Sequence, residues 1–160
     1  MTINDDDLLI GALLVLPFST INRRVFEAYA AAGFTDLRPA HTPVFQYLLP
    51  EGDRIVDLAA RAQTSKQAMG YLVGYLEKAG YLERTPDPRD GRAQIVRRTE
   101  KGRQVNRLAR ETVQEVQKEW TQLLGEDKMV YLLSILRELV QHIGFEYIEN
   151  TRLADAGRVG

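Results

Sequence analysis

The 160-residue sequence contains no cysteine, which excludes disulfide bonds, thiolate metal sites, cysteine nucleophiles and thiol redox switches. Its two histidines, His41 and His142, are too far apart to suggest a shared site, so we interpret each as a satisfied or solvated side chain. It also lacks a nucleophile elbow, a glycine-rich phosphate loop and a cluster with metal-ligand spacing. The sequence therefore argues against an enzyme and predicts neither a metal nor a cofactor.

Long apolar runs are absent as well. The longest run, residues 8–18, is interrupted by Gly11 and Pro17 and is shorter than the roughly 20 residues of a membrane-spanning helix. Residues 4–7, which precede it, are acidic where a signal peptide would be basic. We therefore expect no signal peptide, no membrane partner and a location in the cytoplasm.

The net charge of −1 conceals a separation of charge along the chain. Residues 54–110 contain thirteen Lys and Arg against six Asp and Glu, whereas the rest of the chain contains eight against sixteen. A basic block in a nearly neutral chain is typical of a surface that binds double-stranded nucleic acid, because each cation near a phosphate releases counterions. The alternative is a solvated surface that happens to be rich in charge.

Residues 55–80 carry the pattern of a helix-turn-helix. A short helix over 55–62 is followed by a helix start at Thr64 or Ser65, where Gln67 completes a capping box with Thr64. Gly80 is expected to end the second helix in a left-handed conformation. The residues expected on its core side are Ala68, Met69, Leu72, Val73, Leu76 and Ala79.

The opposite side of this second helix is polar or very small. It carries Lys66, Gln67, Gly70, Tyr71, Gly74 and Lys78. Each glycine inside a helix costs about 1 kcal/mol relative to alanine, so a merely solvated face is not expected to keep two. One explanation is a helix laid in the major groove of DNA, with donors near its N-terminus reaching base edges and phosphates. The other is close packing against another part of the protein.

A hairpin is expected to follow. Residues 81–84 and 93–98 read as two strands joined by a long loop, which Pro86, Pro88 and Gly91 shape. Arg89 and Arg92 flank Asp90 in this loop, so the carboxylate can hold a guanidinium in a fixed direction. Such an arginine suits the minor groove or the adjacent DNA backbone. Alternatively, the loop is a solvated turn whose salt bridge is worth about 0–1 kcal/mol.

The remaining segments are helical by pattern. We expect a helix over 8–32 that Pro17 kinks or divides, and a short helix over 42–49 with Pro43 in its first turn. A long helix starts at Thr99, and another follows a break at 125–127. The apolar stripes of the terminal helices exceed what one small domain buries, which indicates a partner.

Together, residues 54–103 resemble the winged helix-turn-helix core of the MarR family of bacterial transcriptional regulators. The resemblance is carried by Leu58-Ala59, Ser65-Lys66-Gln67, Leu76-Glu77, Gly80-Tyr81-Leu82, the run from Asp87 to Ala93, and Thr99-Glu100-Lys101-Gly102. It implies a mainly α protein with a small β-hairpin wing, formed by residues 1–160 as one domain. Residues 40–99 would form the DNA-binding lobe, and residues 5–33 and 100–150 the dimerisation helices. A repressor that binds a palindromic operator as a homodimer is the expected function.

The resemblance also assigns candidate sites. The residues expected to contact DNA are Ser65, Lys66, Gln67, Gly70, Tyr71, Arg89, Asp90 and Arg92. A small aromatic or lipophilic effector is implied where the dimerisation helices meet the DNA-binding lobe, with Phe26, Tyr29, Phe34, His41, Phe45 and Tyr47 as candidate lining residues. The missing cysteines exclude the thiol-based sensing found in part of the family. Two alternatives stay open, a constitutive DNA binder and a winged-helix module that binds protein.

Overall fold

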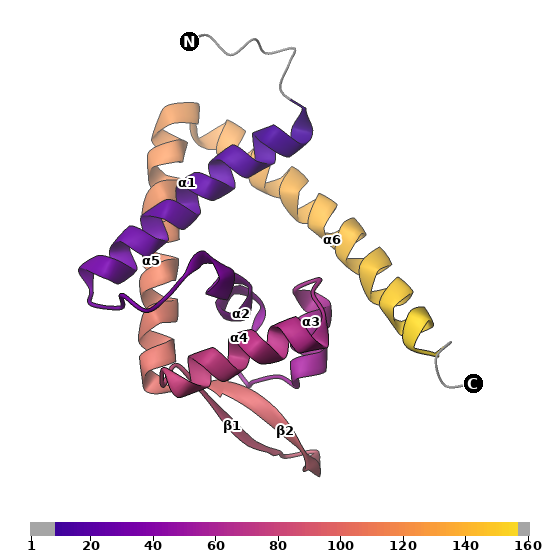
Figure 1. Cartoon of the computed structure of the whole chain (residues 1–160). Coiled ribbons are helices and arrows are strands. Elements are labelled where there is room, and N and C mark those ends of the chain that lie inside the picture. The colour runs from indigo at the N-terminus through magenta and orange to yellow at the C-terminus, as the bar shows by residue number, and fades with distance from the viewer. Residues whose placement is uncertain (1–8, 157–160) are drawn as a thin grey trace.

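The computed structural model describes the backbone of residues 9–156 and the side chains of residues 9–143. Its elements are α1 (Ile10–Ala31), a 3-10 turn (Pro39–His41), α2 (Thr42–Tyr47), α3 (Ile55–Arg61), α4 (Lys66–Lys78), β1 (Leu82–Asp87), β2 (Asp90–Arg98), α5 (Glu100–Leu124) and α6 (Glu126–Ala156). This is the mainly α winged-helix architecture that the sequence predicts. Figure 1 shows α2, α3, α4 and the hairpin as one lobe, beneath α1 where it crosses α5.

Helix α1 continues through Pro17, so of the two expected effects, a kink or a division, the division does not occur. Pro17 lies on the exposed N-terminal half of α1, where water can satisfy the one carbonyl that the missing amide leaves free. The expected acidic helix start at residues 5–7 lies outside the described residues. Within the part of the chain that is described, no helix has both the length and the apolar content to span a membrane.

Residues within one helical turn determine where α4 begins and ends. Ser65, not Thr64, caps the helix, because its hydroxyl oxygen accepts the Ala68 amide hydrogen at 3.1 Å. At the other end Gly80 has φ +79°, as expected. The buried stripe consists of Met69, Val73 and Leu76, whereas Ala68 is exposed and was wrongly assigned to the core. Ala68 precedes Met69 by about 100° around the helix, which takes it off the buried stripe.

The hairpin is longer than expected. Its strands pair from Leu82 opposite Arg98 to Pro86 opposite Gln94, and only two residues, 88–89, separate the strands. Pro86 is tolerated because a two-stranded sheet consists of edges, where a missing amide hydrogen bond is not costly. The expected long loop is therefore wrong, and the basic tip is a tight turn.

Tyr81 joins α4, the hairpin and α5. Its side chain is fully buried, its hydroxyl donates to Asp36 Oδ1 at 2.5 Å, and the Lys101 ammonium lies 4.0 Å from the ring centroid. Gly102, in the first turn of α5, packs so closely that an added Cβ would overlap the Tyr81 carbonyl oxygen. These contacts fix the hairpin relative to α4. Burial raises the pKa of Tyr81, so it stays a neutral hydrogen-bond donor.

The terminal helices leave a large apolar surface uncovered. The N-terminal half of α1 exposes Leu13, Val15 and Phe18, and α6 exposes Val130, Tyr131 and Val140. Figure 1 shows α6 leading from the end of α5 down the side of the molecule toward α3, with which it is in contact. Apolar side chains exposed in this number along two helices are typical of a protein interface.

Candidate nucleic-acid interface and adjoining pocket

The outer face of α4 is open. Ser65, Lys66 and Gln67 are exposed at its N-terminal end, and Tyr71 is 77% exposed. A Cβ added to Gly70 or Gly74 would meet no described atom within 4 Å. Packing against another described part of the chain therefore does not explain the two glycines. Their effect is to keep a smooth surface between polar side chains.

Tyr75 connects α4 to the interior of the lobe. Its ring stacks on His41 with centroids 4.8 Å apart and planes 21° apart, and its hydroxyl donates to the Asp36 carbonyl oxygen at 2.9 Å. His41 Nδ1 accepts the Arg38 amide hydrogen at 3.0 Å. Burial, followed by the charge of Arg38, lowers the pKa of His41, so this imidazole is neutral at pH 7. A neutral histidine therefore lies between α4 and the space behind it.

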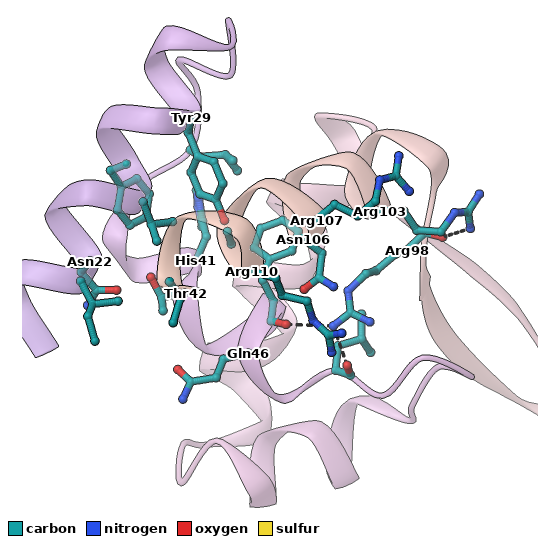
Figure 2. Close-up of a pocket in the computed structure, with 18 of the residues that line it drawn as sticks. Asn22, Tyr29, His41, Thr42, Gln46, Arg98, Arg103, Asn106, Arg107 and Arg110 are labelled. Carbon is teal, nitrogen blue, oxygen red and sulfur yellow. Dashed lines mark hydrogen bonds between the residues drawn. The ribbon is translucent and has the colours of Figure 1, made fainter. Parts of the chain in front are cut away.

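That space is a pocket of about 860 Å³ formed by α1, α2, α5 and the end of β2. The structure brings together four of the predicted lining residues, namely Phe26, Tyr29, His41 and Phe45. Figure 2 labels Tyr29, which comes from α1, and His41, which ends the 3-10 turn, among the lining residues. The volume lies within the range of about 300–1,000 Å³ that is usual for small-molecule sites.

Two predicted lining residues are not in this pocket. Tyr47 follows Phe45 by two positions in α2, which places it about 200° around the helix, where it is 38% exposed. Phe34 packs instead toward the Tyr81 ring, at a centroid distance of 6.2 Å. Four of the six residues named from the sequence therefore line this pocket and two do not, while its role as an effector site stays a prediction.

Sequence reasoning missed the basic wall of the pocket. Arg98, Arg103, Arg107 and Arg110 line it, as Figure 2 shows. The last three recur at helical spacing in α5, a signal that the sequence contained. Arg98 ends β2, and only the fold brings it to the pocket. Its guanidinium donates to the carbonyl oxygens of Phe45 and Leu48, at 2.8 and 2.5 Å.

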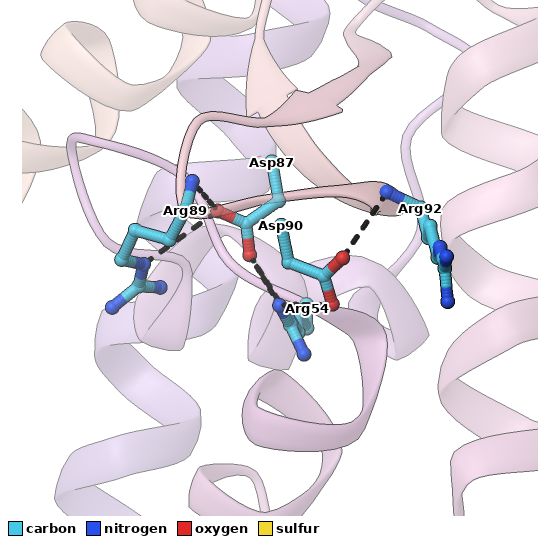
Figure 3. Close-up of polar contacts among 5 residues, drawn as sticks. All are labelled: Arg54, Asp87, Arg89, Asp90 and Arg92. Carbon is cyan, nitrogen blue, oxygen red and sulfur yellow. Dashed lines mark hydrogen bonds and ion pairs between the residues drawn. The ribbon is translucent and has the colours of Figure 1, made fainter.

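The wing tip is held by two aspartates and an arginine from outside the hairpin (Figure 3). The buried Asp87 carboxylate accepts the Arg89 amide hydrogen at 2.9 Å and Arg54 Nε at 2.8 Å. These hydrogen bonds, the Arg89 amide first, lower the pKa of Asp87. Arg54 Nη2 also lies 3.3 Å from Asp90 Oδ2. Because Arg54 immediately precedes α3, these contacts tie the wing tip to the helix-turn-helix.

Asp90 therefore does not direct the guanidinium of Arg89 or Arg92, so that part of the prediction was wrong. Asp90 accepts the Arg92 backbone amide hydrogen at 3.2 Å and does not hold the Arg92 guanidinium, which points away from it in Figure 3. Arg89 makes only a long contact of 3.5 Å with Asp87, and its side chain is 83% exposed. Arg89 and Arg92 thus project from a fixed backbone with guanidinium groups that are accessible to a partner. Sequence reasoning missed Asp87 and Arg54.

Comparison with known proteins agrees with this geometry. The sequence model of the MarR family matches residues 35–93. The uncharacterised HTH-type transcriptional regulator YdcH of Bacillus subtilis (strain 168) is 27% identical over 134 residues, which cover 82% of this chain and 90% of YdcH.

Two solved structures of the repressor CouR are similar to this one. In one, CouR is bound to a 23-mer DNA duplex; it is 25% identical with a TM-score of 0.66, over 88% of this chain and 98% of that one. In the other, CouR from Rhodococcus jostii RHA1 is bound to p-coumaroyl-CoA; it is 26% identical with a TM-score of 0.65, over 85% and 92%. The helix-turn-helix, the wing and these relatives together place the chain in the MarR family of transcriptional regulators, with its winged-helix DNA-binding fold.

Proposed function

We propose that this regulator represses transcription by binding a palindromic operator as a homodimer, and that a small effector in the pocket releases it. The observation that carries the proposal is the glycine stripe of α4. Gly70 and Gly74 reduce the stability of the helix, a Cβ added to either would meet no described atom within 4 Å, and both lie between exposed polar side chains. A partner that approaches the backbone closely explains them, and the groove of a DNA duplex has the required shape.

The proposed roles of the DNA-contacting residues follow from their positions. Gln67, in the first turn of α4, reads a base edge, since an amide side chain can bond adenine bidentately. Ser65 and Lys66 contact phosphates beside it, and Tyr71 lies against the duplex. Arg89 and Arg92 enter or flank the minor groove, while Asp90 fixes the backbone of the turn that presents them.

The terminal helices supply the proposed dimer interface. The exposed apolar side chains of α1 and α6 support assignment of residues 5–33 and 100–150 to dimerisation, and residues 40–99 to the DNA-binding lobe. A twofold axis through such an interface would present two copies of α4 to half-sites one helical turn apart. A cytoplasmic location follows from a chromosomal target.

The pocket favours an effector-controlled regulator over a constitutive DNA binder. It lies between α1 and the DNA-binding lobe, and His41 connects it to α4 through Tyr75. The similar repressor CouR has been solved both with DNA and with p-coumaroyl-CoA, which supports control by a small molecule here.

The test begins with selection of bound duplexes from a random library, followed by titration of a selected duplex at several salt concentrations. We expect a palindromic site, two chains per site, and an affinity that falls steeply as salt rises, since phosphate contacts release counterions. Failure to enrich any sequence, or an affinity that does not depend on salt, would favour the protein-binding module instead.

A further inference from the structure

The lining of the pocket is divided by chemistry. Among the described residues that line it there are four arginines and no aspartate, glutamate or lysine. The arginines come from the end of β2 and one face of α5, and Figure 2 shows α1 across the pocket from them. The α1 side is mainly apolar: Phe18, Ile21, Val25 and Phe26 line it together with Tyr29 and one amide, Asn22. One end of a ligand would meet hydrocarbon and the other end would meet cations.

The positive charge of the basic wall is only partly balanced. Glu100 is shared by two arginines: its carboxylate lies 2.9 Å from Arg103 Nε and 2.9 Å from Arg107 Nη2. Among the described residues, no carboxylate lies within ion-pair distance of Arg98 or Arg110. Four guanidinium groups and one carboxylate leave three formal positive charges beside an apolar cavity.

Arg98 is the most unusual of the four. It donates to backbone carbonyls of residues 45, 48 and 49, but its Nε is buried and makes no hydrogen bond within the described chain. Its pKa is lowered by burial first and then by the charge of Arg110, so the two cations are close enough to repel each other. Guanidinium groups without carboxylate partners are suited to bind phosphate, which accepts two parallel N–H donors.

We propose that the effector is an amphipathic phosphate ester, with its apolar group against α1 and α2 and its phosphate on Arg98 and Arg110. The inference rests on the proposed function, because it names the ligand class of the proposed effector site. A phosphate monoester carries close to two negative charges near neutral pH, against one for a carboxylate. It therefore offsets more of the excess charge of this wall than a simple aromatic acid does.

The same contacts connect the ligand to the DNA-binding lobe. Arg98 is the last residue of the wing strand β2, and the carbonyls it binds end α2 and begin the segment that leads to α3. A phosphate that draws the Arg98 guanidinium toward the pocket weakens this connection. Ligand and operator should therefore weaken each other's binding by the same factor.

The test uses the full-length protein without DNA and three ligands with one ring system. Calorimetry compares 2-naphthyl phosphate, 2-naphthoate and 2-naphthol, which carry about two, one and no negative charges at about pH 7.5, with inorganic phosphate as the ligand without an apolar group. We expect 2-naphthyl phosphate to bind about tenfold more tightly than 2-naphthoate, as one further charge-assisted contact provides. Equal or tighter binding of the carboxylate overturns the phosphate assignment. If inorganic phosphate binds as tightly as the ester, the assignment of an apolar group to the ligand is overturned.

Variants locate the charge preference. Arg110→Gln should remove most of the preference for phosphate over carboxylate, whereas Arg110→Lys, which keeps the charge, should retain most of it. Arg23→Gln is the matched control, since Arg23 is an exposed residue of α1 that pairs with Glu27 and does not line the pocket. A preference that survives Arg110→Gln, or that Arg23→Gln reduces equally, places the phosphate elsewhere and overturns the proposal.

A separate titration with the selected operator distinguishes the two proposals. If the ligand-free protein binds no operator, the proposed function is contradicted. The preference for phosphate over carboxylate is measured without DNA, so that result does not affect it. Addition of 2-naphthyl phosphate should lower operator affinity. Phosphate binding that leaves operator affinity unchanged overturns the coupling through Arg98.

Discussion

Replacing Gly70 or Gly74 of α4 by alanine should change stability and DNA binding in opposite directions. An added Cβ at either position meets no described atom within 4 Å, and neither glycine has a positive φ, so alanine fits without strain. Alanine in a helix interior is favoured over glycine by about 0.5–1 kcal/mol. For a domain of this size, that gain should raise the melting temperature by about 1–4 °C.

The same methyl group should interfere with a bound duplex. If the backbone of α4 lies against the DNA groove, as we propose, each Cβ occupies space that base edges or the sugar-phosphate backbone need. Overpacking of a close interface costs about 1–3 kcal/mol, which corresponds to a loss of roughly 5- to 150-fold in operator affinity. The variant would thus be more stable than the natural protein and a weaker DNA binder.

Thermal unfolding and fluorescence anisotropy with a labelled operator measure the two effects on the same preparations. Gly102→Ala is the comparison for stability, because an added Cβ there overlaps the Tyr81 carbonyl oxygen and should lower the melting temperature despite the same helix preference. A higher melting temperature with unchanged operator affinity for both α4 variants would refute the reasoning. It would mean that no DNA atom approaches this part of the helix.

Four further predictions follow from the structure. Gln67→Ala should relax base preference at one operator position by about 1–3 kcal/mol, as competition with single-base operator variants would measure, and an unchanged profile would contradict base reading. Arg89→Ala and Arg92→Ala should lower the affinity for many DNA sequences to a similar extent. If both variants bind the operator as tightly as the wild type at moderate salt, the wing does not lie in a groove. Leu132→Glu should convert dimers to monomers in sedimentation, because an unpaired carboxylate in an apolar interface costs roughly several kcal/mol. Because the pKa of His41 is lowered, the unfolded chain takes up this proton at a higher pH than the folded protein does. The free energy of unfolding should therefore decrease as the pH is lowered from about 6.5, and the decrease should be smaller in His41→Gln.

The features that the sequence predicted correctly depend on neighbouring residues. The helix-turn-helix, the end of α4 at Gly80 and the start of α5 at Thr99 arise from bonds and backbone angles that span three or four residues. Thr99 accepts the Gly102 amide hydrogen, for example, as a helix-capping threonine should. The same local rule left the cap of α4 open between Thr64 and Ser65, and the structure assigns it to Ser65.

The features that were missed depend on the fold. Arg54 and Asp87 are 33 residues apart, and their ion pair exists only because the wing folds back beside the start of α3. The basic wall joins the end of a strand to one face of a helix, so no single periodic pattern contains it. Tyr47 was a different kind of error, since its position two residues after Phe45 in a helix already placed it on another face.

The contacts around Tyr81 limit how an effector can act. Tyr81 is buried between Asp36, Lys101 and Gly102, and the hairpin keeps one register from Leu82 to Pro86, so α4, the base of the wing and the first turn of α5 form a rigid corner. A ligand is therefore not expected to move the wing relative to α4 within one lobe. It can change DNA affinity only by favouring one placement of the whole corner relative to α1 and α2. The contacts available for that change border the pocket, namely the Arg98 bonds to the end of α2 and the stack of His41 on Tyr75.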